Sequence, residues 1–388
     1  MMETDEIALS EPECGAREIE LVNAVLQSSR WSSGPMLESF ETAFAGWSGR
    51  AHAIAVASGT LGAWIALRGL GIGETDEVIC ASHTWHQVAQ AITLAGATPV
   101  FADIDYWSGC LNVEKVRQKI SARTRAILAG NTNGHPAAWG PLRELAGEHG
   151  LRLIEDSTEA LGSRYRGHSV GTFGDVSLFD FSTPSALCAG EGGMLVTDDE
   201  GLAHELRYLR QRRVADRESV SVGSRVPLQA GMSELTAALG LAQLAGLDER
   251  LARRKQVEAW YHEQMQSFEG IKPPYLAEDV EEVHWMLYVV HLGKRFTQSA
   301  RAQMIDDMKS CGIETAAYSQ PLHEQFHYMS AGDAIGRKRG VLPDTERIGD
   351  RALALPLHSQ LDADQVKYIV KTLKDTATNV GAGAAIYL

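Results

Sequence analysis

Two acidic side chains follow short apolar runs of the kind that form buried strands, and both could transfer protons. Asp180 directly follows the run 176–179, and Glu159 lies five residues after the run 151–154. When carboxylates share a confined site, one pKa rises and one acid stays protonated, which suits general acid–base chemistry. Glu159 and Asp180 are therefore candidate catalytic residues.

Other side chains could bind a metal or act as a nucleophile. His83 and His86 enclose Trp85 in the run His-Thr-Trp-His, and this spacing permits two imidazoles to share a divalent metal with carboxylates. Most histidines in such patterns are only hydrogen-bonded, so we expect no metal. Ser185 and Cys188 carry nucleophilic atoms, but neither has a base beside it in the sequence.

The turn Ser58-Gly59-Thr60 could bind an anion. It separates an apolar run at 53–56 from a helical apolar pattern at 61–70. Backbone N–H groups at a helix N-terminus form a natural anion cradle, which makes Gly59 and Thr60 candidate ligand-binding residues. A plain helix cap is the alternative for so short a motif.

These candidates depend on an alternation of short apolar runs with helical segments, which predicts a mostly parallel sheet covered by helices. In such a sheet, ligands bind at the carboxyl ends of the strands. We expect a large domain at 1–250 and a smaller α+β domain at 251–388, joined by a charged helix at 247–266. The tail 376–388 has no periodic pattern, and we expect it to be partly mobile. The predicted strands are 53–56, 77–80, 99–102, 124–128, 151–154, 176–179 and 194–197.

The composition excludes several classes of protein. The 388-residue chain has 44% hydrophobic residues and a formal net charge of −14, with no basic stripe, so we expect neither nucleic acid nor membrane as a partner. No run approaches the roughly 18 apolar residues of a membrane span, and the N-terminus lacks the apolar core of a secretion signal. Five cysteines are widely spaced without a Cys-x-x-Cys pair, which favours a reduced, cytoplasmic protein.

Motifs along 18–374 together resemble one family in their order and spacing. The chain resembles the DegT/DnrJ/EryC1/StrS sugar aminotransferases, which use pyridoxal phosphate (PLP). This resemblance implies the fold-type I architecture: a mostly parallel seven-stranded sheet between helices, plus a smaller C-terminal α+β domain. It also implies a homodimer with the active site at the interface. The motifs include Ala57-Ser58-Gly59-Thr60, Ile154-Glu155-Asp156-Ser157, Gly190-Glu191-Gly192-Gly193, Pro321-Leu322-His323 and Leu355-Pro356-Leu357-His358.

The resemblance assigns roles to several residues. Asp156 matches the aspartate that pairs with the pyridine nitrogen of PLP, and Trp85 matches the aromatic residue that stacks on the ring. The turn at Gly59 and Thr60 matches the phosphate-binding turn, and His323 matches a histidine of the small domain. A strand-end cap for Asp156 and a core position for Trp85 are the alternatives.

Four positions depart from the family pattern. The Schiff-base lysine falls on Ser185, whose hydroxyl cannot form an imine with PLP. Asp180 replaces a serine that donates to the phosphate, and Glu159 replaces a neutral residue near the ring oxygen. The partner-subunit loop at 227–232 loses its asparagine and arginine but retains Gln229, a candidate cofactor contact. A single change at Ser185 could reflect an engineered mutant, whereas four together indicate natural divergence.

Three functions are consistent with these departures. The first is PLP-independent acid–base chemistry, such as dehydration, cyclisation, condensation or isomerisation, on a sugar, cyclitol or natural-product intermediate. Glu159, Asp180, Ser185, His86 and His323 would then surround the substrate. The second is an enzyme that holds PLP or its amine form (PMP) non-covalently, as the lysine-less sugar dehydratases of the family do with a histidine. The third is a non-catalytic partner subunit of an active aminotransferase paralogue.

Overall fold

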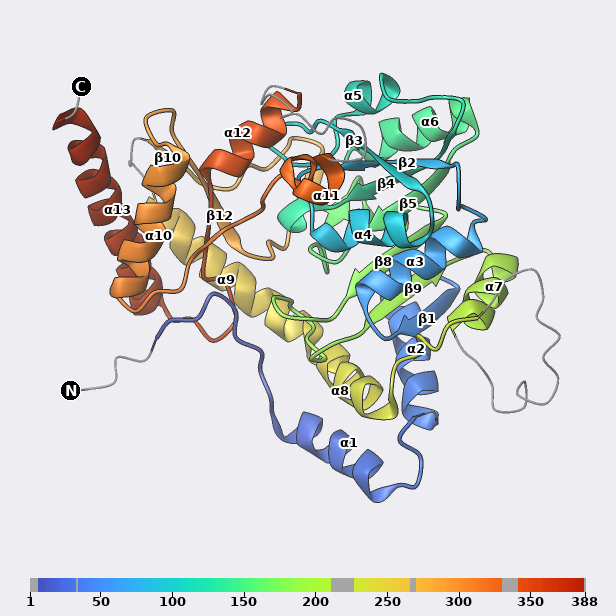
Figure 1. Cartoon of the computed structure of the whole chain (residues 1–388). Coiled ribbons are helices and arrows are strands. Elements are labelled where there is room, and N and C mark those ends of the chain that lie inside the picture. Colours follow the sequence, from blue (N-terminus) through green and yellow to red (C-terminus); the bar gives the residue numbers. More distant parts are fainter. Residues whose placement is uncertain (1–5, 33, 211–226, 266–269, 330–340, 387–388) are drawn as a thin grey trace.

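Seven apolar segments form one sheet in the structure, which is a computed structural model (Figure 1). The structure describes every residue except 1–5, 33, 211–226, 266–269, 330–340 and 387–388. All seven predicted strands are confirmed within a residue or two at each end. In sheet order they are β1 (His52–Val56), β9 (Gly193–Thr197), β8 (Val176–Asp180), β5 (Arg152–Asp156), β4 (Thr124–Gly130), β2 (Glu77–Ala81) and β3 (Thr98–Ala102).

The strand directions bring the candidate residues to one edge of the sheet. β8, β5, β4, β2 and β3 pair in parallel, whereas β9 pairs antiparallel with β8 and with β1. β1 and the five parallel strands therefore end at the same edge, where ligands of open α/β sheets bind. Asp156 and Asp180 are the last residues of β5 and β8 at this edge, and the segments that follow β1 and β2 carry Gly59 and Trp85.

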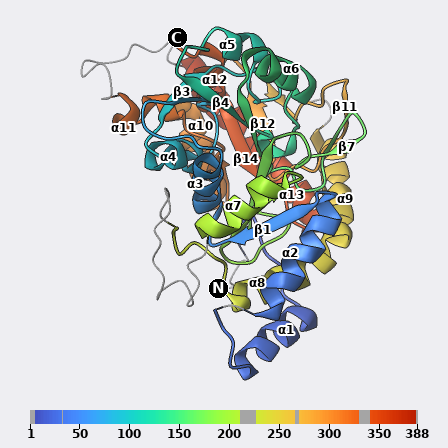
Figure 2. The ribbon, with the colours of Figure 1, turned by 90° about the vertical axis from the view of Figure 1, so that its right-hand side faces the viewer.

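Helices cover both faces of this sheet, because successive strand residues point to opposite sides and both sides are apolar. Buried side chains of α3, α4 and α7 pack with Ile54 and Val78, whereas those of α2 and α6 pack with Ala53 and Ile79 on the other face (Figure 2). The helices are α1 (Ala16–Gln27), α2 (Pro35–Ser48), α3 (Gly59–Gly69), α4 (His86–Leu94), α5 (Val113–Arg117), α6 (Trp139–His149), α7 (Glu200–Arg210) and α8 (Glu234–Ala245).

A smaller α+β unit follows the helix α9 (Leu247–Met265). Its sheet has the order β10 (Ile271–Lys272), β12 (Tyr288–Leu292), β14 (Ala352–Leu355) and β13 (Ala316–Ala317). The helices α10 (Gln298–Ser310), α11 (Phe326–Met329), α12 (Pro343–Arg351) and α13 (Ala363–Ile386) accompany it, and β11 (Val280–Glu282) pairs with the hairpin β6 (Arg164–Tyr165) and β7 (His168–Ser169). The division at residues 250 and 251 falls inside α9 and stays a prediction.

The structure at the end of the chain differs from the irregular tail that the sequence predicted. Residues 376–386 continue α13 rather than forming an irregular tail. The buried positions Val370, Leu373, Ala377 and Val380 are spaced by three and four residues, so the apolar face of the helix continues through Ala377 and Val380. The many Gly and Ala residues concealed this pattern in the sequence.

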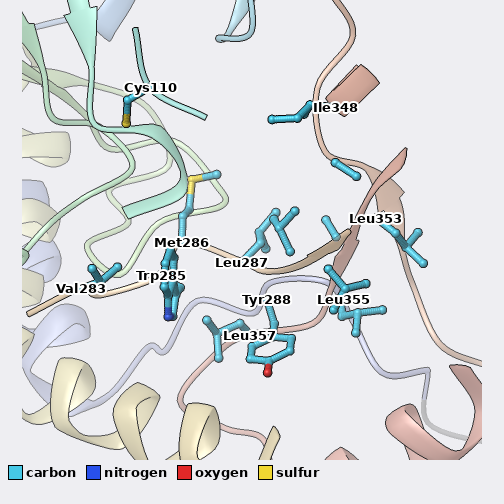
Figure 3. Close-up of a cluster of buried hydrophobic side chains, with 14 of the residues drawn as sticks. Cys110, Val283, Trp285, Met286, Leu287, Tyr288, Ile348, Leu353, Leu355 and Leu357 are labelled. Atoms are coloured by element: carbon cyan, nitrogen blue, oxygen red, sulfur yellow. The ribbon is translucent and has the colours of Figure 1, made fainter. Parts of the chain in front are cut away.

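A buried cluster joins the two parts of the chain next to the site. Figure 3 shows Met286 and Leu287 in the apolar cluster that also contains Cys110 of the large part and Leu353 of the small sheet. The buried Arg254 guanidinium of α9 fixes this junction by donating to the carbonyl oxygen of Met286 at 2.7 Å. Among the described residues, no helix is long and apolar enough to cross a membrane.

Candidate active site

A pocket opens at the carboxyl edge of the large sheet, and we call it the Trp85 pocket. Its walls come from α3, the start of α4, the ends of β5 and β8, and the junction residue Met286. The sequence predicted Gly59, Thr60, Trp85, Asp156 and Asp180 as site residues, and all five lie here. The pocket is lined by Gly59, Thr60, Ala63, Trp85, Gln87, Val88, Asp156, Thr158, Leu178, Asp180, Ser182, Thr183, Pro184 and Met286.

Asp180 occupies the anion cradle at the start of α3. Its Oδ2 accepts a hydrogen bond from the N–H of Gly59 at 2.7 Å, and its Oδ1 accepts one from the N–H of Ser182 at 2.7 Å. The start of α3 thus binds a carboxylate of the chain itself, and ligand binding by Gly59 and Thr60 stays a prediction. The approach requires glycine, because a Cβ on Gly59 would lie 2.5 Å from Asp180 Oδ2 and 2.8 Å from its Cβ.

Asp156 lies deeper in the same pocket. Its side chain is 8% exposed, and burial raises the pKa of the Asp156 carboxyl to about 6, with a smaller contribution from the Asp180 charge. Within the described chain its only hydrogen-bond donor is Thr158, whose N–H lies at 3.1 Å and whose side chain also donates. The carboxylate therefore keeps unused acceptor capacity toward the pocket.

Glu155, the neighbour of Asp156, has the opposite environment. It is fully buried and accepts hydrogen bonds from six donors, so its carboxylate supports the loops beneath the site rather than facing the pocket. The donors are Asn131 Nδ2, Ser157 Oγ, Ser177 Oγ and the N–H groups of Gly171, Phe173 and Gly174.

Glu159 fixes the position of Trp85. Its carboxylate accepts hydrogen bonds from Trp85 Nε1, from the N–H of Asn133 and, at 2.5 Å, from Tyr318 Oη. Burial nevertheless raises the pKa of the Glu159 carboxyl to about 7. Tyr318 follows β13 of the small sheet, so this cluster connects both parts of the chain through the indole of Trp85.

The structure does not bring all of the predicted catalytic residues into one pocket. Glu159 and His86 line a hollow next to the Trp85 pocket, which Trp85 also borders, and His86 is exposed there. His83 is buried in a third cavity with His291. His83 and His86 therefore face different spaces, which contradicts the alternative that they share a metal.

Ser185 also lies outside the described lining, although Thr183 and Pro184 belong to it. Its Oγ accepts a hydrogen bond from the N–H of Leu187 at 3.2 Å, so the hydroxyl stabilises a turn. A role for Ser185 in the pocket therefore stays a prediction.

Two further candidates lie away from the pocket. His323 is buried, and its Nδ1 lies 2.7 Å from Ser82 Oγ. Gln229 is exposed, in a segment whose next residue, Ala230, accepts a hydrogen bond from the N–H of Ala57. Neither residue lines the Trp85 pocket of its own chain.

One group of side chains has the composition of a metal site. The ligand atoms of His323, Glu324 and Glu346 lie within 4.8 Å of one another. Glu346 Oε1 already accepts hydrogen bonds from the N–H groups of Val341 and Leu342 at 3.1 and 3.2 Å. The sequence analysis had named only His323 of this group.

Sequence reasoning missed several residues of the site. Gln87 lines the Trp85 pocket, and its buried Oε1 has no hydrogen-bond partner among the described residues. Tyr318 reaches the cluster from 159 residues away in the sequence, so only the tertiary fold reveals it. Burial lowers the pKa values of His83 and His291 to about 3 and 4, and in the part of the chain that the structure describes neither Nδ1 has a partner.

The residues that line the Trp85 pocket fit the ring of PLP or PMP but not its phosphate. Asp156 and Trp85 offer a buried carboxylate and an aromatic wall for a pyridine ring. At the phosphate end, the Gly59 N–H already donates to Asp180, and no described lining residue is Lys or Arg. Two like charges at 4 Å repel by about 4 kcal/mol at an effective dielectric constant near 20. A phosphate therefore does not fit beside an ionised Asp180.

Comparison with known proteins gives a consistent result. Residues 12–374 match the model of the DegT/DnrJ/EryC1/StrS aminotransferase family. A Bacillus subtilis protein named spore coat polysaccharide biosynthesis protein SpsC is 33% identical over 376 residues, covering 94% of this chain and 95% of that protein. A Streptomyces venezuelae dTDP-3-amino-3,4,6-trideoxy-alpha-D-glucose transaminase is 36% identical over 361 residues, covering 92% and 91%.

A solved structure shows the same architecture. The crystal structure of S. venezuelae DesV in complex with a ketimine intermediate superposes with a TM-score of 0.87. The two chains are 33% identical, and the match covers 96% of this chain and 99% of that one. The expected fold-type I architecture is thereby confirmed.

Proposed function

Because the chain belongs to the DegT/DnrJ/EryC1/StrS aminotransferase family, we propose that it is a biosynthetic enzyme acting on a sugar-like small molecule in the Trp85 pocket, without a Schiff-base lysine. One observation carries this proposal: the described lining of the pocket contains no lysine. The segment between Asp180 and Pro184, which forms one wall, continues into Ser185, where the family pattern places the lysine. Imine chemistry needs an amine, so the chain itself cannot anchor PLP covalently there.

Non-covalent use of PLP or PMP is the candidate that the relatives favour. One relative is named a transaminase, and one similar structure holds a ketimine intermediate. Asp156 and Trp85 support this candidate, since a carboxylate at the ring nitrogen would keep the bound ring protonated and electron-withdrawing. Asp180 opposes it at the phosphate end, so a phosphate would bind only after this carboxylate moves or takes up a proton.

PLP-independent acid–base chemistry is the second candidate, and Asp156 is the observation that favours it. With a pKa raised to about 6, this buried carboxyl exchanges a proton near neutral pH. Its unused acceptor capacity faces the pocket, whereas the oxygens of Glu159 are already hydrogen-bonded to Trp85 and Tyr318. Asp156 is therefore a better proton acceptor for this candidate than Glu159, which holds Trp85 in place.

Borohydride reduction tests the proposal. The purified protein is incubated with PLP, reduced, and analysed by intact mass. We expect no covalent adduct at the pocket after dialysis. A stoichiometric adduct that peptide mapping assigns to a lysine at the pocket would refute the proposal. A dialysable absorbance band without an adduct would support non-covalent PLP, and turnover by cofactor-free protein would support acid–base chemistry.

The oligomeric state is also part of the proposal. A homodimer would place the exposed Gln229 of one subunit near the pocket of the other, as the family resemblance implies. A complex with an intact paralogue is the alternative. Light scattering of the purified chain distinguishes them, since a monomer that dimerises only with the paralogue would exclude the homodimer.

A further inference from the structure

The charged side chains that line the Trp85 pocket are all hydrogen-bond acceptors. Its charged lining residues in the described chain are Asp156 and Asp180, both acidic. A sugar or cofactor phosphate needs the reverse, namely cationic side chains or free N–H groups at a helix N-terminus. Here the Gly59 N–H, which such a phosphate would use, is hydrogen-bonded to Asp180 at 2.7 Å.

One of these carboxylates has spare acceptor capacity. Among the described residues, Thr158 is the only hydrogen-bond donor to the Asp156 carboxylate, which lines the pocket and has about four lone-pair sites. A ligand that carries an N–H donor could therefore bind this carboxylate without displacing an existing contact.

The charge and the aromatic wall specify the ligand further. An ammonium group carries three donors and a positive charge, and it is attracted to carboxylates and to indole rings. Asp156 and Asp180 supply the carboxylates, and Trp85, held by Glu159, supplies the ring.

We propose that the Trp85 pocket binds a phosphate-free primary amine whose ammonium group donates to Asp156, while Asp180 excludes phosphate from the cradle at Gly59. This inference rests on the proposed function, because it names the ligand class of the same pocket. The amine is either the substrate or the product of the reaction at this site.

Three matched probes test the inference by titration calorimetry on the full-length protein. Pyridoxamine carries the amine without phosphate, pyridoxine replaces the amine by a hydroxyl, and PMP adds the phosphate. We expect pyridoxamine to bind about tenfold more tightly than either of the other two, equivalent to about 1.4 kcal/mol. No saturable pyridoxamine binding, or PMP binding as tight as pyridoxamine, would overturn the proposal.

Variants of Asp180 and Asp156 test which carboxylate causes each part of the binding preference. Asp180→Ser should increase PMP affinity about tenfold and leave pyridoxine unchanged, whereas Asp156→Asn should remove the advantage of pyridoxamine over pyridoxine. Asp364→Asn, an exposed carboxylate of α13, is the control, and circular dichroism checks folding. Unchanged ratios in both pocket variants would refute the assignment.

The affinity ratios and the borohydride experiment together distinguish a failure of this inference from a failure of the proposed function. If PMP binds best but borohydride leaves no adduct, the amine inference fails and the lysine-free proposal stands. If borohydride fixes PLP to a lysine at the pocket, the proposed function fails whatever the affinity ratios are.

Discussion

The Asp180 carboxylate accepts a hydrogen bond from the backbone N–H of Gly59 at 2.7 Å, at the first residue of α3. The positive end of the helix is thus neutralised by the protein's own side chain. Because Ser58 caps the same helix by accepting from the N–H of Leu61, two N–H groups of its first turn already donate to side chains of the chain itself. This hydrogen bond connects the departure from the family pattern at Asp180 with the kind of ligand that the pocket can bind.

The close approach of Gly59 and Asp180 predicts a large effect for a small substitution. In Gly59→Ala the new Cβ would overlap Asp180 Oδ2, so we expect the free energy of unfolding to fall by about 1–3 kcal/mol. The double variant with Asp180→Ser removes the overlap with Oδ2 but keeps the Cβ at 2.8 Å, so it should recover only part of that loss. Gly147→Ala in α6, where nothing lies within 4 Å of the new Cβ, is the matched control and should be neutral or stabilising. Equal urea midpoints for both alanine variants would show that the contact is absent.

Glu155 should be essential for folding. Replacing it by Gln puts an NH₂ group against N–H and O–H donors and removes a carboxylate that satisfies six of them, so we expect a loss of about 3–5 kcal/mol. Chemical denaturation measures this loss. Glu114→Gln, on the exposed short helix α5, is the control and should change little.

Replacing Asp156 should have the opposite effect to replacing Glu155, because we expect it to stabilise the folded protein. Its folded pKa is about 6 against an ordinary value of 3.8, so the folded state binds the proton more tightly. Stability therefore falls as pH rises from about 4 to 6 in the wild type. Asp156→Asn keeps an acceptor for Thr158 and avoids this cost, so it should be more stable than the wild type by about 1–3 kcal/mol at pH 8. The gain should be smaller at pH 5, and a destabilised variant at pH 8 would contradict the prediction.

The sequence predicted the sheet and much of the pocket, and physical reasons explain its limits. Each strand is an apolar run bounded by turn residues, and the parallel order places Asp156 and Asp180 at one edge regardless of finer detail. The direction of individual side chains depends on local turns. The Ser185 hydroxyl accepts a hydrogen bond from the N–H of Leu187 in a local turn, and Glu159 accepts hydrogen bonds from Trp85 and the distant Tyr318. Long-range contacts of this kind leave no periodic signal in a single sequence.

The Glu159 cluster makes a last prediction, about coupling between the two parts of the chain. Tyr318→Phe removes one donor from Glu159, and Glu159→Gln weakens all three contacts, so the two variants should be non-additive by about 1 kcal/mol or more. The Glu159 cluster should also make stability depend on pH. The folded pKa of Glu159 is raised to about 7 from 4.5, so the free energy of unfolding falls as pH rises across that interval. Because the Tyr318 hydrogen bond lowers this pKa, the free energy of unfolding of Tyr318→Phe should continue to fall to a higher pH. Urea unfolding of the single and double variants between pH 5 and 8 measures both effects, and additive losses with an unchanged pH profile would mean that Tyr318 does not act on Glu159.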